Sequence, residues 1–153
     1  MIVSRSLTLG EMAMIQQMFG TSSEFSRARI FPYNYWWPLP NKRAMTPTGD
    51  IFFPPEDHRD DFSLPTVPLN LRALFMHEAT HLYQWYVLRQ WVIVRGPFDR
   101  NYEYELVPGK ALKDYGLEQM GQIVQDYYTL AHGGVVRGKK IEDYRDAVPV
   151  REK

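Results

Sequence analysis

Two histidines and a glutamate in the segment HEATH, residues 77–81, have the types and spacing that metal-assisted hydrolysis needs. On a helix, His77 and His81 lie four residues apart on one face, so both imidazoles can bind one Zn²⁺ ion. Glu78 can then reach a water molecule at that ion and act as general base. The pattern predicts a zinc centre with a water nucleophile. The alternative is a chance pattern of two surface histidines around a solvated glutamate.

The sequence around this motif favours a buried helix. Apolar residues run into and out of the motif, and no Gly or Pro occurs between Pro68 and Gly96. Thr66 is the expected start of this helix. A segment that is apolar almost all round belongs in a core, where two His and a Glu are costly unless something binds them. Core histidines satisfied by backbone carbonyls would leave Glu78 unexplained, so a metal is the better account.

A catalytic zinc site usually has three protein ligands and one open position. The metzincin continuation is excluded, because it needs Gly and His where this chain has Gln84 and Val87. The third ligand must therefore come from farther along the chain or from before the motif. The candidates are Glu118, His132, His58, Glu103, Glu105, Asp126 and Glu142.

Glu118 is the favoured third ligand because it opens a second predicted helix, residues 117–128. An apolar stripe at helical spacing runs along that helix: Leu117, Met120, Val124 and Tyr128. Gly121, one turn after Glu118, would let this helix approach the HEATH helix closely. The alternative is that Glu118 only complements the helix dipole in a first turn. His132, just before a Gly-Gly pair where the helix should end, ranks second and could equally be a C-terminal cap.

Several further segments carry a resemblance to a known family: residues 7–11, 44–55, 59–63 and 115–119, together with the HEATH motif. A HExxH helix followed by a helix with a metal-binding Glu resembles the gluzincin arrangement. Within that class the chain is similar to the Vgr-related and Rhs-associated metallopeptidase domains of type VI secretion systems. The resemblance implies a zincin-like α+β fold and a zinc peptidase or amidase toxin that a spike or delivery protein carries into the periplasm of a neighbouring cell. It also implies a peptide or peptidoglycan-type substrate and an immunity protein.

Composition limits the other possibilities. The chain has 153 residues, 44% hydrophobic and 14% aromatic, which indicates one compact domain over residues 1–153 with a real core. Eighteen basic and eighteen acidic residues leave no net charge, so we expect neither nucleic acid nor membrane insertion. No Cys is present, so any metal must sit on His and carboxylates. The first residues lack a long apolar stretch, so we expect synthesis in the cytoplasm without a signal peptide.

Three further elements are predicted to surround the HEATH helix. Thr8 and Glu11 form a capping-box pattern for a helix that ends at Gly20. Residues 27–35 favour a strand, and residues 45–53 favour a hairpin whose turn is residues 47–50. We expect an α+β domain in which the HEATH helix packs on this short sheet or hairpin. Residues 50–53 are the candidate sheet edge for an extended substrate; the alternative is a hairpin that only covers the core.

Aromatic residues offer two less specific signals. Tyr33, Tyr35, Trp36 and Trp37 are a candidate platform for sugar rings, although such runs more often belong to a core or an interface. Residues 102–105 alternate Tyr and Glu, so an extended segment would place both Tyr on one side and both Glu on the other.

The predicted mechanism uses His77, His81 and Glu118 as zinc ligands and Glu78 as the base that later returns its proton to the leaving amine. A donor for the developing oxyanion usually helps. The candidates for that donor are Tyr115, Tyr102, Tyr104 and His132. The sequence does not choose among them, and Tyr115 is the working assignment. Asp114 or Asp126 could orient a ligating imidazole. Two other functions fit the motif, a cytoplasmic regulatory gluzincin and a non-catalytic zinc-binding interaction module.

Overall fold

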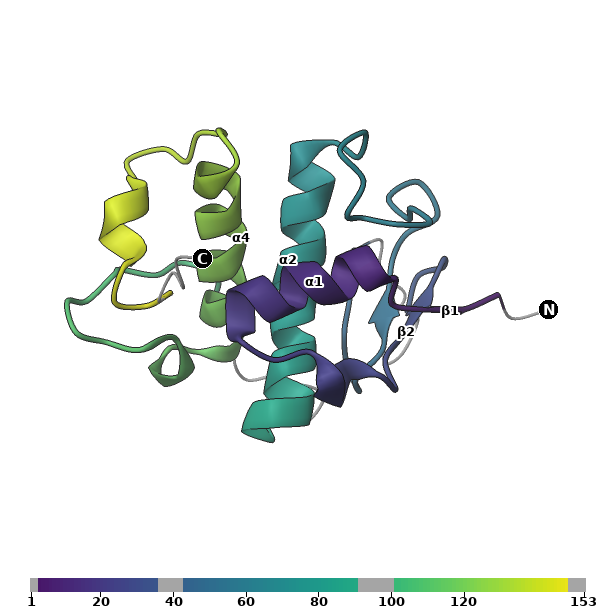
Figure 1. Ribbon diagram of the computed structural model, residues 1–153. Coiled ribbons are helices and arrows are strands. Elements are labelled where there is room, and N and C mark those ends of the chain that lie inside the picture. Colours follow the sequence, from purple (N-terminus) through teal and green to yellow (C-terminus); the bar gives the residue numbers. More distant parts are fainter. Residues whose placement is uncertain (1–2, 36–42, 91–100, 149–153) are drawn as a thin grey trace.

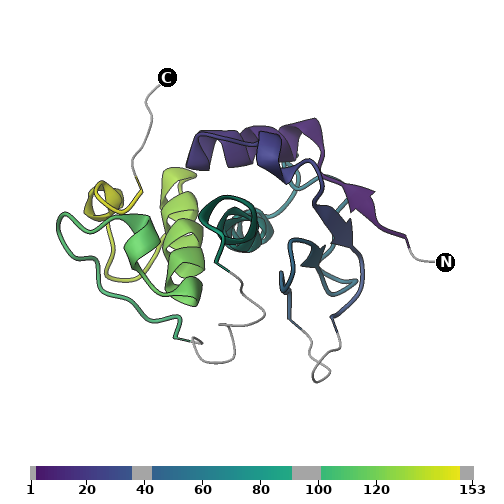
Figure 2. The same cartoon turned by 90° about the horizontal axis from the view of Figure 1, so that it is seen from below.

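The structure is a computed structural model that describes residues 3–35, 43–90 and 101–148. Within those ranges the main elements are three α-helices, α1 (Leu9–Phe19), α2 (Leu69–Tyr83) and α4 (Leu117–Ala131), and a sheet of strands β1 (Arg5–Ser6), β2 (Arg29–Phe31) and β3 (Ile51–Phe52). Helix α2 lies between α4 and the sheet, and α1 crosses over it (Figures 1 and 2). The α+β class and the central place of the HEATH helix agree with the prediction.

Shorter helical segments connect these elements: η1 (Ser23–Phe25), the π-helical η2 (Gln84–Leu88), η4 (Leu112–Asp114) and η5 (Ile141–Tyr144). Helix η2 continues α2 without a break, so the HEATH helix ends in a widened turn. Across the described ranges, no helix combines the length and the apolar character needed to cross a bilayer.

Helix α1 begins and ends where its caps predict. The Thr8 hydroxyl accepts from Glu11 N at 3.0 Å, and the Glu11 carboxylate accepts from Thr8 N at 2.9 Å, which completes the capping box. Gly20 closes the helix with φ of 78°, a conformation that favours glycine. Glu11 is fully buried, yet it also accepts from Arg5 and from Phe62 N, so its carboxylate ties β1 and a distant loop to the helix.

The sheet corrects one prediction. Strand β2 is shorter than the predicted residues 27–35, and β3 pairs with it in parallel (Ile30 with Ile51). On the other side of β3, Phe52 exchanges both backbone hydrogen bonds with Met45, at 2.8 and 2.9 Å, so the predicted hairpin is present. Strand β3 is an outer strand of this sheet, as predicted for residues 50–53, and the single bridge to Met45 occupies the outward backbone groups of Phe52. Binding of an extended substrate along this edge stays a prediction.

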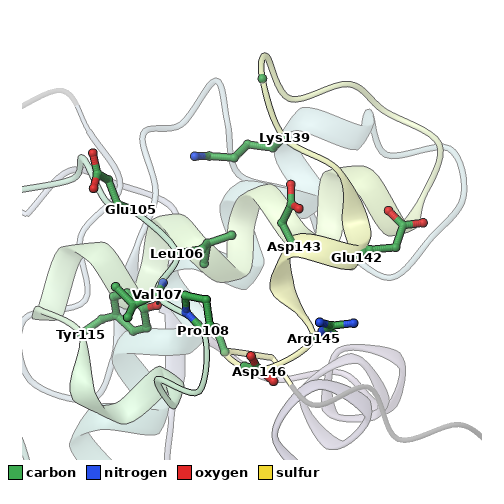
Figure 3. A pocket seen from close by; sticks show the side chains of 12 residues that line it. Glu105, Leu106, Val107, Pro108, Tyr115, Lys139, Glu142, Asp143, Arg145 and Asp146 are labelled. Atoms are coloured by element: carbon green, nitrogen blue, oxygen red, sulfur yellow. Dashed lines mark hydrogen bonds between the residues drawn. The ribbon is translucent and has the colours of Figure 1, made fainter.

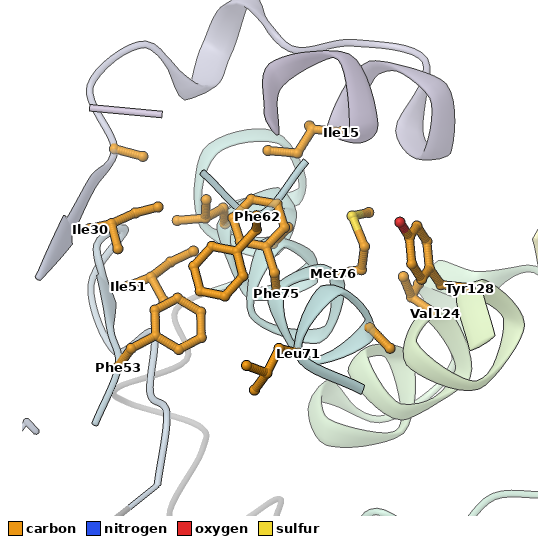
Figure 4. Close-up of a cluster of buried hydrophobic side chains, with 14 of the residues drawn as sticks. Ile15, Ile30, Ile51, Phe53, Phe62, Leu71, Phe75, Met76, Val124 and Tyr128 are labelled. Atoms are coloured by element: carbon orange, nitrogen blue, oxygen red, sulfur yellow. The ribbon is translucent and has the colours of Figure 1, made fainter. Parts of the chain in front are cut away.

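Helix α2 carries the core on two sides. Phe75 stacks on Phe62 with ring centroids 5.2 Å apart, in the cluster that the sheet completes, while Met76 faces Val124 and Tyr128 of α4 (Figure 4). Helix α2 begins at Leu69 with Pro68 as its N-cap, three residues after the predicted Thr66 start. The reason is local, since the residue before a proline is disfavoured in the α-region.

The aromatic platform is described only in part. Tyr33 packs on Phe31 with ring centroids 5.5 Å apart, and Tyr35 packs on Phe52 at 4.9 Å. Successive strand residues face opposite sides of a sheet, so these rings cover the face away from buried Ile30 and Ile51. Trp36 and Trp37 lie outside the described residues. A sugar-binding role for this cluster stays a prediction.

Candidate metal centre

The antiparallel helices α2 and α4 bring the three predicted ligands together. Glu118 Oε1 lies 2.6 Å from His81 Nε2 and 4.0 Å from His77 Nε2, so one carboxylate oxygen faces both imidazoles. Two ligands of one tetrahedral zinc ion would be about 3.3 Å apart for bond lengths near 2.0–2.1 Å, a value between these two distances. A small turn of the Glu118 carboxylate would therefore suit a metal. Nitrogen and carboxylate donors without Cys are a set that Zn²⁺ accepts.

Glu78 offers a second possible donor set. Ligand atoms of His77, Glu78 and His81 lie within 4.8 Å of one another, and all three side chains are buried. We assign Glu118 to the metal because its oxygen already contacts an imidazole nitrogen, whereas Glu78 accepts from Thr46 Oγ1 at 3.2 Å. With Glu118 as the third ligand, Glu78 would be available as a base.

Two glutamines orient the imidazoles. His77 Nδ1 lies 2.9 Å from Gln125 Oε1, and His81 Nδ1 lies 2.8 Å from Gln84 Oε1. Gln84 Nε2 donates to Leu117 O at 2.9 Å, which fixes the amide so that its oxygen faces His81. Each Nδ1 then carries a proton and donates it, which leaves Nε2 of each ring as the atom that would bind a metal, in His81 after loss of the proton shared with Glu118. This role of the two glutamines was not predicted from the sequence.

Signals for both glutamines were present in the sequence. Gln84 follows His81 by three residues in an apolar helix, and it is fully buried. Gln125 follows Glu118 by two helical turns, which places both on one face of α4. The predicted orienting carboxylates do not serve: Asp126 accepts from Tyr104 and Gln122, and Asp114 is exposed at the end of η4.

Replacing Gln84 by Leu should lower zinc affinity about 10- to 100-fold, because His81 Nδ1 loses its acceptor. The free energy of unfolding should also fall by about 1–3 kcal/mol, since the buried hydrogen bonds of the Gln84 amide to His81 and to Leu117 O are lost. Metal titration and thermal unfolding measure the two effects. Gln16→Leu, at an exposed glutamine of α1, is the matched control. Unchanged zinc affinity in Gln84→Leu would show that His81 needs no such partner.

Gly121 permits the close approach of the two helices. A Cβ atom at this position would lie 2.8 Å from His77 Nε2 and 2.9 Å from His77 Cε1, too near for either atom to remain in place. The His77 ring has little freedom to yield, because Gln125 binds its other nitrogen and the Tyr102 ring stacks on it at 6.0 Å. The predicted role of Gly121 in helix approach is confirmed.

Gly121→Ala should therefore lower zinc affinity about 10-fold or more by displacing His77. The helix itself should remain, because Ala favours a helix interior over Gly by about 1 kcal/mol. Metal titration beside circular dichroism separates the two effects. Gln122→Ala, one residue along α4, is the matched control. A Gly121→Ala protein with wild-type zinc affinity would mean that His77 is not a ligand.

Burial and the Glu118 carboxylate set the charges of the centre. Burial and neighbouring His81 lower the pKa of His77 to about 4, so this imidazole is neutral near pH 7. Burial also lowers the pKa of His81, but the hydrogen bond and charge of Glu118 outweigh it and raise that pKa to about 9. Burial raises the pKa of Glu78 to about 7, close to the value that suits a general base near neutral pH.

Zinc uptake should consequently release a proton. A His81 pKa of about 9 means that the metal-free imidazole is mostly protonated at pH 8, so binding should release about 0.9 proton there. Apparent zinc affinity should rise about tenfold per pH unit between pH 7 and 9 and level off above. Calorimetry in two buffers of different ionisation enthalpy measures the proton count. Zinc binding without proton release at pH 8 would contradict the His81–Glu118 pairing.

The tyrosines are placed differently from the working assignment. The Tyr115 hydroxyl accepts from Val107 N at 3.0 Å, and its ring lies under Lys110 Nζ at 4.5 Å. It lines a hollow of about 480 Å³ bounded by η5 and the segment before η4 (Figure 3). The structure thus does not bring Tyr115 to the imidazoles. Tyr102 is the tyrosine that does so, because its ring stacks on His77 and its hydroxyl hydrogen-bonds Glu118.

The other ligand candidates lie elsewhere. His132 is the C-cap of α4, its Nδ1 lies 2.9 Å from Tyr128 O, and it takes the capping role that was its alternative. Burial and the nearby Arg5 lower the pKa of His58, which belongs to the opposite, N-terminal side of the core. Tyr102 and Tyr104 are more buried than the glutamates between and after them, as the alternation predicted. The exposed candidate acids are Glu103, Glu105 and Glu142.

Comparisons with known proteins give two relatives. The type VI secretion system spike protein VgrG2b of Pseudomonas aeruginosa is 35% identical over 134 residues, which are 81% of this chain and 13% of the spike protein. The solved effector domain of Pseudomonas aeruginosa VgrG2b is 33% identical, with a TM-score of 0.64, over 86% of this chain and 76% of that domain. The chain therefore spans about 13% of the length of the spike protein and most of its effector domain. No protein-family model matches.

Proposed function

The chain belongs to the family of the VgrG2b effector domain, and from that premise we propose that it is a zinc-dependent peptidase or amidase that acts as an antibacterial type VI secretion effector. The observation that carries this proposal is the convergence of His77 Nε2, His81 Nε2 and Glu118 Oε1 beside the separate buried carboxylate of Glu78. A structural zinc site needs no such additional base, since four protein ligands complete it.

The three ligands would hold a zinc ion that activates a water molecule and polarises the scissile carbonyl. Thr46 donates to Glu78 Oε1, which leaves Glu78 Oε2 to take a proton from the attacking water. Glu78 then gives this proton to the leaving amine, so one carboxylate serves both halves of the reaction. Its pKa near 7, raised by burial, allows both transfers at neutral pH.

The family supports a proposal for delivery and substrate. VgrG2b is named as a spike protein, so we propose that a spike or other delivery protein carries this domain into the periplasm of a target cell. A peptide or a peptidoglycan-type amide would be the substrate there, and the producing cell would need an immunity protein. The balanced charge of the chain supports neither nucleic acid nor a membrane surface as a partner.

Compartment-specific expression tests this function. The chain is produced in a bacterial host with and without a signal peptide that directs it to the periplasm, and growth and cell shape are followed. Growth arrest only with the signal peptide is the expected result. Arrest only in the cytoplasm would favour a regulatory peptidase with a cytoplasmic target. Zinc binding without toxicity in either compartment, and without hydrolysis of periplasmic extracts, would favour a non-catalytic module.

A further inference from the structure

Tyr102 contacts two of the three proposed zinc ligands. Its ring stacks on His77 with centroids 6.0 Å apart and planes at 27°, and its hydroxyl hydrogen-bonds the Glu118 carboxylate. Glu118 Oε1 lies in turn 2.6 Å from His81 Nε2. The phenol hydroxyl therefore lies beside the carboxylate that faces both imidazoles, at the edge of the proposed metal centre.

Arg43 polarises this phenol. Arg43 Nη2 donates to Tyr102 Oη at 2.5 Å, and the guanidinium carbon lies 5.2 Å from the centre of the Tyr102 ring. A phenol oxygen that accepts from a guanidinium must direct its own hydrogen elsewhere, and donation in such a chain is strengthened. Arg43 also adds positive charge within electrostatic range of Glu78 and His77.

We propose that Tyr102 and Arg43 form an oxyanion site beside the metal centre, which takes the negatively charged oxygen of a tetrahedral intermediate. The inference rests on the proposed function and names a catalytic residue for it. When water attacks, the new carbon–oxygen bond forms, the carbonyl π electrons move onto the carbonyl oxygen, and the water proton passes to Glu78. The Tyr102 hydroxyl, which donates to Glu118 in this structure, would turn its hydrogen to that oxygen without transferring the proton, while Arg43 keeps the phenol in place.

A competing role would be purely supportive. Tyr102 could serve only to hold Glu118 in the orientation that binds zinc, as partners of metal ligands commonly do. In that case its loss would weaken zinc binding and leave anion binding at the metal-loaded centre unchanged. The two roles therefore differ in a measurement that needs no substrate.

The test uses the full chain loaded with Co²⁺, whose visible absorption reports both metal uptake and anion binding, with inorganic phosphate as a tetrahedral oxyanion. Tyr102→Phe should weaken phosphate binding about 10- to 100-fold, the loss expected for one hydrogen bond to a charged group. Phosphate binding is measured at saturating cobalt, so that any loss of metal affinity from the missing Tyr102–Glu118 hydrogen bond does not enter the comparison. Arg43→Gln should act in the same direction. Tyr104→Phe is the matched control, because the Tyr104 hydroxyl bonds Asp126 and Tyr144 instead.

Three results would overturn the inference. Wild-type protein that takes up cobalt and binds no phosphate has no oxyanion site. Tyr102→Phe with weakened cobalt binding and unchanged phosphate affinity would make Tyr102 a support for Glu118. Equal phosphate affinity in Tyr102→Phe and Tyr104→Phe would remove any special role. Failure of the proposed function looks different: wild-type protein would either take up no cobalt, or take it up and hydrolyse nothing whatever the phosphate affinity of the Tyr102 variant.

Discussion

Glu78→Gln should reduce metal-dependent hydrolysis about 10²- to 10⁴-fold, which is the usual contribution of a positioned general base. The zinc content should stay at about one ion per chain. Gln keeps the size of Glu78 and a side-chain oxygen for Thr46, so the buried site should remain intact. What it loses is the ability to take a proton from water. Elemental analysis measures the zinc content. Growth of cells that export the variant to the periplasm reports the loss of hydrolysis.

Glu11→Gln is the matched control for this variant. Both glutamates are buried in helices, but Glu11 accepts from Arg5, Thr8 N and Phe62 N, which accounts for its carboxylate as a structural group. Its replacement should lower the free energy of unfolding by about 1–3 kcal/mol without touching zinc content. Persistent toxicity in Glu78→Gln protein of normal zinc content would sink the catalytic role of Glu78.

Local signals explain why the ligands could be predicted from the sequence. His77 and His81 owe their common face to helical spacing alone, and Gly121 marks the close approach of the second helix that carries Glu118. The capping box that starts α1 is equally local. The motif and the capping box depend on residues within one or two turns, whereas Gly121 is a local sign of a contact that only the packing of α4 on α2 completes.

Long-range pairing explains what the sequence left open. The parallel pairing of β3 with β2 joins segments about twenty residues apart. Nothing local in residues 50–53 shows which strand they pair with or in which direction. Gln125 reaches His77 across the helix pair, 48 residues away. Tyr102 and Tyr115 are alike as residue types, and only the packing brings the first to His77 and the second to Val107 N.

Glu118→Ala and His81→Ala should each lower zinc affinity about 70- to 900-fold, if one ligand contributes roughly a quarter of the 10–16 kcal/mol typical of a structural zinc site. His81→Ala removes a nitrogen donor, and Glu118→Ala removes the oxygen that faces both imidazoles. Competition with a chelator of known affinity gives the loss for each variant. Glu142→Ala, at an exposed acid of η5, is the control.

The same measurement decides between the two donor sets, because each set predicts zinc loss for a different glutamate variant. With Glu118 as the ligand, Glu118→Ala loses zinc and Glu78→Gln keeps it; with Glu78 as the ligand, the outcomes reverse. Glu118→Gln sharpens the contrast, since an amide can still accept a hydrogen bond from His81 but carries no charge for the metal. Zinc retained in Glu118→Gln and Glu118→Ala alike would reduce Glu118 to a hydrogen-bond partner of His81. The base would then have to come from a residue other than Glu78.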